Sequence, residues 1–68
     1  MTEIVFVVEE AGEGGFTARG VGASVFTEAD TLEELRQAVR EAVRCHFEPV
    51  DQPKVILLHV VRDEVLAT

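Results

Sequence analysis

The side chains best suited to nucleophilic or metal chemistry are one cysteine, Cys45, and two histidines, His46 and His59. Neighbouring residues on a helix point about 100° apart, so Cys45 and His46 do not face each other as a nucleophile and its base. We expect both to pack within or beside the apolar stripe of a helix, with His59 able to approach His46 across a helix–sheet interface. Two histidines do not complete a structural zinc site. The sequence therefore predicts no catalytic residue and no metal site.

A glycine-rich segment, Gly12-Glu13-Gly14-Gly15, invites comparison with phosphate-binding loops. It lacks the Lys-Ser/Thr ending and the following helix of such loops, and Glu13 would repel a phosphate. A hairpin turn that needs positive φ explains the glycines instead. The carboxylates elsewhere show no spacing typical of a general-acid pair. We therefore predict no cofactor site and expect that the protein is not an enzyme.

Arg36, Arg40 and Arg44 recur every four residues and form a stripe along one helix. We expect this stripe to be solvated, with Glu33 pairing with Arg36 and Glu48 with Arg44. Contact with RNA or with an acidic partner surface is the alternative. The net charge of −7, from 13 acidic and six basic residues, repels nucleic-acid phosphates. We therefore expect no DNA binding and find little support for RNA binding.

The elements that must position these side chains lie in one short chain of 68 residues. That length predicts a single domain over 1–62 and a short tail over 63–68. A core this small usually needs a disulfide, a metal or a partner chain, and one cysteine makes no internal disulfide. No apolar run reaches the length of a membrane span, and no signal peptide is visible, so we expect a cytoplasmic protein.

Four strands and one helix are predicted from runs of apolar residues. The strands are expected at Glu3–Glu9, Phe16–Val21, Ser24–Thr27 and Val55–Val61. A capping box at Thr31 and Glu34 begins the helix, and Pro49 ends it at the preceding residue. Its apolar stripe comprises Leu32, Leu35, Val39, Ala42, Val43 and His46.

This order, β-β-β-α-β, predicts an α+β fold. An antiparallel meander of three strands would carry the helix on one face. Right-handed crossover then favours the last strand beside the first and parallel to it.

The first and last strands are apolar on both sides, although one helix covers only one face of a sheet. We predict that the uncovered side chains bind a partner, which can be a second copy stacking its sheet or pairing along the edge of the last strand. The predicted partner-binding residues are Val5, Val7, Ile56, Leu58 and Val60. Folding of the tail residues Val65 and Leu66 over part of this face is the alternative.

Two stretches resemble the N-terminal domain of HicB-type antitoxins. Residues 14–18, Gly-Gly-Phe-Thr-Ala, match that family's Gly-Gly-Tyr/Phe strand start, and residues 26–35 match its Thr-x-Gly-Asp-Thr-Leu-Glu-Glu-Ala helix entry. Ala38 and Ala42 suit its alanine-rich helix. The resemblance spans about residues 3–61. Residues 19–24 depart from it, since they replace a longer, proline-containing bend. Ala29 stands where the family has glycine, and the last strand is unusually apolar.

The resemblance implies a partial ribonuclease-H-like fold without catalytic acids and a domain that masks a small basic HicA-type toxin. It does not imply operator binding, since we see no C-terminal DNA-binding segment. The predicted function is a non-catalytic protein-binding module that self-associates through its second sheet face. A self-assembling structural or regulatory subunit of a larger enzyme complex is the alternative. The sequence does not identify the partner or the oligomer number.

Overall fold

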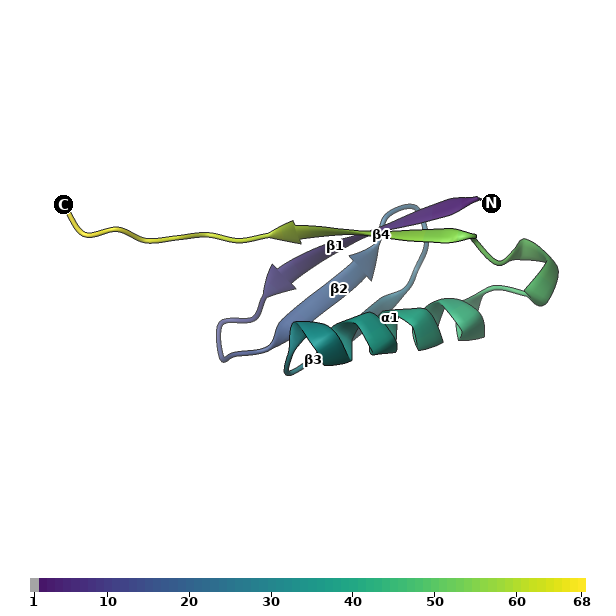
Figure 1. Ribbon diagram of the computed structural model, residues 1–68, viewed down its shortest axis with the longest axis horizontal. Coiled ribbons are helices and arrows are strands. Elements are labelled where there is room, and N and C mark those ends of the chain that lie inside the picture. The colour runs from purple at the N-terminus through teal and green to yellow at the C-terminus, as the bar shows by residue number, and fades with distance from the viewer. Residues whose placement is uncertain (1) are drawn as a thin grey trace.

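A mixed four-stranded sheet with one helix on one face makes up the fold in the computed structural model, which describes residues 2–68 (Figure 1). The elements are β1 (Glu3–Glu10), β2 (Phe16–Gly20), β3 (Phe26–Ala29), α1 (Leu32–His46), a 3-10 turn η1 (Pro49–Asp51) and β4 (Val55–Val61). The predicted α+β class and β-β-β-α-β order are confirmed.

The strand order across the sheet is β3-β2-β1-β4, so β1 and β2 are central and β3 and β4 are the edges. β1 pairs antiparallel with β2, and β2 antiparallel with β3. β4 returns beside β1 and parallel to it, as predicted, and aligns Ile56 with Ile4 and Leu58 with Phe6. Aligned residues point to the same face, so this register decides which side chains of β4 face α1.

The bend between β2 and β3 differs from the prediction. β2 ends at Gly20 rather than Val21, and β3 begins at Phe26 rather than Ser24. Gly22 adopts a φ of 80°, which favours glycine, and the Gly20 N–H donates to the Val25 carbonyl over 2.8 Å. This hydrogen bond closes the bend and keeps residues 21–25 out of the strands.

The helix α1 begins at the predicted cap. The Thr31 hydroxyl oxygen accepts from the Glu34 backbone N–H at 3.1 Å, and the hydroxyl lies 3.1 Å from Glu34 Oε1, to which it donates. Glu34 therefore contacts the Thr31 hydroxyl rather than its backbone N–H. The helix ends at His46, before Pro49, and the 3-10 turn that follows was not predicted.

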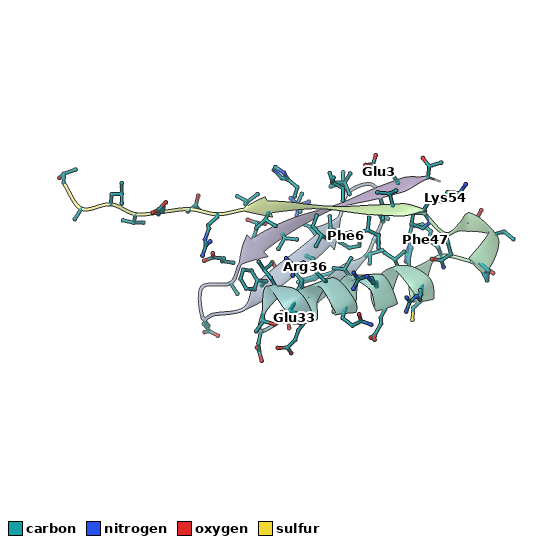
Figure 2. The ribbon with its side chains drawn as sticks, in the orientation of Figure 1. Glu3, Phe6, Glu33, Arg36, Phe47 and Lys54 are labelled. Atoms are coloured by element: carbon teal, nitrogen blue, oxygen red, sulfur yellow. The ribbon has the colours of Figure 1, made fainter. Side chains whose placement is uncertain are left out.

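The core lies between the sheet and α1, where Figure 2 shows Phe6 pointing from β1 toward the helix and Glu33 on the outward side of α1. Three of the predicted stripe residues, Leu35, Val39 and Val43, are buried. The remaining buried residues are Ile4, Phe6, Val8, Ala18 and Val25. The helix packs mainly over β2 and β3, and β4 extends beyond its cover. β4 therefore has uncovered side chains on both faces of the sheet, on the face opposite α1 and on the helix side next to α1.

Candidate protein-binding surfaces

The face of the sheet opposite α1 carries an apolar patch that no element of residues 2–68 covers. Val5 and Val7 of β1 are half-buried there, beside Val55 and Leu57 of β4, which are 54% and 47% exposed. We call these four residues the open-face patch. Its rim includes Glu3, Glu9 and Glu28, together with Arg19 and His59. An apolar centre with a mainly acidic rim is a surface suited to a basic protein partner.

The five predicted partner-binding residues do not share one face. Val5 and Val7 lie on the open face, as expected. Ile56, Leu58 and Val60 align with Ile4, Phe6 and Val8 and therefore point to the helix side of the sheet. The assumption that all five form one surface is wrong, because the parallel register puts the even-numbered residues of β4 on the helix side. Their role in binding stays a prediction.

A groove of about 470 Å³ runs between α1 and β4 on the helix side. Its floor is apolar and includes Ile56 and Leu58, which are half-buried because α1 does not lie over them. Its walls carry Arg36, Arg40 and Arg44 from the helix and Lys54 from the loop directly before β4. Val39, Val43, Gln52 and Pro53 complete the lining. We call this the basic groove.

Four of the six basic residues of the chain line the basic groove. In residues 2–68 the structure shows one ion pair, from Arg62 Nε to Glu10 Oε1 at 2.9 Å, and it lies outside the groove. The predicted pairs Glu33–Arg36 and Glu48–Arg44 do not form. Figure 2 shows why for the first pair, since Glu33 points outward and Arg36 lies toward β4. The arginines are therefore available to an acidic ligand.

Sequence reasoning found the arginine stripe but missed the groove that it lines. Lys54 lies ten residues beyond Arg44 in the chain, and the loop between them brings it to the same end of the molecule (Figure 2). Gln52 fixes this loop, because its Nε2 donates to the Phe47 carbonyl at 2.7 Å and to the Arg44 carbonyl at 3.2 Å. The sequence feature that could have indicated this loop is Gln52 itself, a polar residue shortly after the predicted end of the helix.

The tail after β4 does not cover either surface. It continues away from the body of the protein in an extended conformation (Figure 1). Val65 and Leu66 are 94% and 79% exposed. The alternative in which these two residues fold over the open face is therefore absent from this structure, and their apolar side chains remain uncovered.

The cysteine and histidines lie apart from one another. Cys45 and His46 are exposed rather than packed in the core, since Leu35, Val39 and Val43 already fill the side of α1 that faces the sheet. The His46 ring makes an edge-to-face contact with Phe47, with ring centres 4.8 Å apart. His59 aligns with Val7 and so points to the open face, away from α1. The predicted approach of His59 to His46 is wrong.

A second hollow lies between the β1–β2 hairpin and the start of α1. It is lined by Glu13, Glu28, Asp30 and Glu34 among smaller residues. Within residues 2–68, no group of three or more histidine, cysteine or carboxylate side chains is arranged to hold a metal ion. We see no specific ligand for this hollow.

The helices of residues 2–68 are all too short or too polar to cross a membrane.

Two relatives of this chain carry the same family name. A UPF0150 protein from Archaeoglobus fulgidus is 50% identical over 52 residues, which are 76% of this chain and 77% of the relative. A UPF0150 protein from Thermotoga maritima is 38% identical over 65 residues, 96% of this chain and 91% of the relative. No family model and no solved structure matches the chain. On the strength of these two relatives, the chain belongs to the UPF0150 protein family.

Proposed function

We propose that this protein is a non-catalytic binding module whose open-face patch docks a small basic protein of the HicA toxin type. The observation that carries the proposal is an uncovered apolar patch with glutamates on its rim. Burying Val55 and Leu57 in an interface would contribute about 2 kcal/mol each as an upper bound. The resemblance of residues 14–18 and 26–35 to HicB-type antitoxins supports the class of partner. The exposed thiol of Cys45 favours a reducing cytoplasm as its location.

The charge of the rim favours a basic partner over a second copy at this face. Two copies stacked by their open faces would bring the glutamates at positions 3, 9 and 28 of both sheets toward one another. Like charges facing one another across an interface cost affinity, whereas a basic surface meets them favourably. Stacking through the second sheet face therefore stays a prediction that this rim does not favour.

Calorimetric titration with a purified HicA-type toxin from the same genome tests the proposal. We expect Leu57→Thr and Val5→Thr each to weaken binding by about tenfold, because each makes the apolar centre polar and keeps a residue suited to a strand. Val50→Thr is the matched control, since Val50 is 90% exposed on η1, away from the patch. No binding, or equal loss in all three variants, would contradict the proposal. Co-purification with a large enzyme would support the alternative role as its subunit.

A further inference from the structure

We propose that two copies of this chain pair through β4, so that Glu64 in the acidic tail of each copy lies beside Lys54 at the outer rim of the other copy's basic groove. This pairing does not depend on the proposed toxin-binding role, because strand pairing uses the backbone edge of β4 and leaves the open face of the sheet exposed. Val55 and Leu57 of the open-face patch gain Asp63 and Val61 of the second copy as neighbours on that face. Three features of the chain support it: an unprotected edge strand, a groove of positive charge, and an acidic tail that extends away from the body of the protein.

β4 is an edge strand, and no strand of the described residues pairs with its outer side. Its seven residues contain no proline, lysine or acidic residue, which are the usual devices that protect an edge from pairing. Leu57, Val60 and Val61 are among its exposed apolar side chains. The other edge, β3, has only four residues and carries Glu28. β4 is therefore the edge that favours pairing with another chain.

The tail carries negative charge, which complements the positive charge of the basic groove. Asp63 and Glu64 follow β4 directly, and the exposed Val65 and Leu66 come next. The groove offers cationic side chains above an apolar floor of Ile56 and Leu58. The acidic residues complement the cationic side chains of the groove. An RNA strand would match the arginines but not the apolar floor, and the net charge of −7 repels it.

The tail of the same copy does not reach the far end of this groove. Lys54 lies seven strand positions before Val61, a distance of about 23 Å along β4. Asp63 and Glu64 are only two and three residues beyond Val61, too few to turn and run back along the strand. A tail glutamate that meets Lys54 therefore comes from another copy.

Antiparallel pairing of two β4 strands brings an acidic tail residue of one copy to Lys54 of the other. When the pair is centred on His59, Glu64 of the second copy lies opposite Lys54, on the groove side. Val60 of the second copy then lies opposite Leu58, and its Leu66 continues toward Gln52. A twofold axis repeats every contact, so each copy gives its tail and receives one. On the helix side this register places Glu64 opposite Lys54 and Val60 opposite Leu58, while Arg62 of the second copy lies opposite Ile56.

Charge reversal on each side tests the pairing by sedimentation equilibrium. We expect the wild-type protein to dimerise, and its dissociation constant to rise with salt because screening weakens the ion pairs. We expect the tail variant Asp63→Lys/Glu64→Lys and the groove variant Arg44→Glu/Lys54→Glu each to weaken dimerisation by about tenfold or more. Mixing the two variants in equal amounts should restore the dimer, since the basic tail then meets the acidic groove and the native tail meets the native groove.

The mixing result separates a specific contact from damage to the fold. Two variants that dimerise as tightly as the wild type, or a mixture that stays monomeric, would overturn the pairing. So would a wild-type protein that stays monomeric, or a groove variant that loses affinity for a labelled single-stranded RNA while its dimerisation is unchanged. Val5→Thr should leave the dimer intact and weaken toxin binding, and the tail variant should do the reverse. A failure of this pairing is thereby distinguished from a failure of the proposed function.

Discussion

At the scale of single residues, Gln52 has an effect that its place in a loop does not suggest. Its side-chain amide donates to two carbonyl groups, those of Arg44 and Phe47, at the end of α1. Carbonyls at a helix end have no partner within the helix, so this amide satisfies groups that would otherwise depend on water. It also fixes the loop that brings Lys54 beside the arginines.

Replacing Gln52 by alanine should lower the free energy of unfolding by about 1 kcal/mol, because two hydrogen bonds to the helix end are lost. Urea denaturation followed by circular dichroism measures the change. Gln37→Ala is the matched control, since Gln37 is exposed on α1 and only accepts a bond from Arg40 at 3.3 Å. Equal stability of the two variants would show that the Gln52 contacts contribute nothing.

At the scale of elements, the hairpin between β1 and β2 depends on one glycine more than on its neighbours. Gly15 has a φ of 83°, and a Cβ there would lie 2.9 Å from the Ala29 carbonyl oxygen of β3. Gly15→Ala should therefore lower the free energy of unfolding by about 2 kcal/mol, from backbone strain and the close contact together. Thermal and urea unfolding measure the loss. Gly12→Ala is the control, because its Cβ would meet nothing within 4 Å, and we expect almost no change. A similar loss in both variants would contradict this account of the hairpin.

The elements also show what the sequence can and cannot predict. Thr31 and Glu34 carry a local signal, so the start of α1 was predicted to the residue. β4 was also predicted with the right bounds, from its run of aliphatic residues. Its direction beside β1 was predicted too, but the side that faces α1 was not, because a strand that is apolar on both sides has no alternation from which to identify the buried face. Only the register against β1, which aligns Ile56 with Ile4, decides that Ile56 and Leu58 face the groove.

At the scale of the whole molecule, most of the positive charge lies apart from the negative charge. The acidic residues predominate in the chain, yet four of its six basic residues line one groove. This separation was not predictable from the arginine spacing alone, since Lys54 joins the arginines only through the fold. A protein with a local basic site on an acidic body has a surface that is complementary to other parts of itself. The proposed pairing of two copies uses this complementarity, and its geometry is open to a direct measurement.

Disulfide cross-linking distinguishes edge pairing of β4 from stacking of two open faces. In an antiparallel pair centred on His59, the two copies of that residue lie directly opposite, with Cα atoms about 4.5–5.5 Å apart, within the range that a disulfide spans. Stacked sheets lie about 10 Å apart, which is too far. In a Cys45→Ser background, which removes the exposed native thiol, we expect His59→Cys to give a covalent dimer under mild oxidation. Val50→Cys, on the exposed turn η1, should remain monomeric on a non-reducing gel. Cross-linking that is no faster at position 59 than at position 50 would exclude this register, because the two thiols would then meet only by random collision.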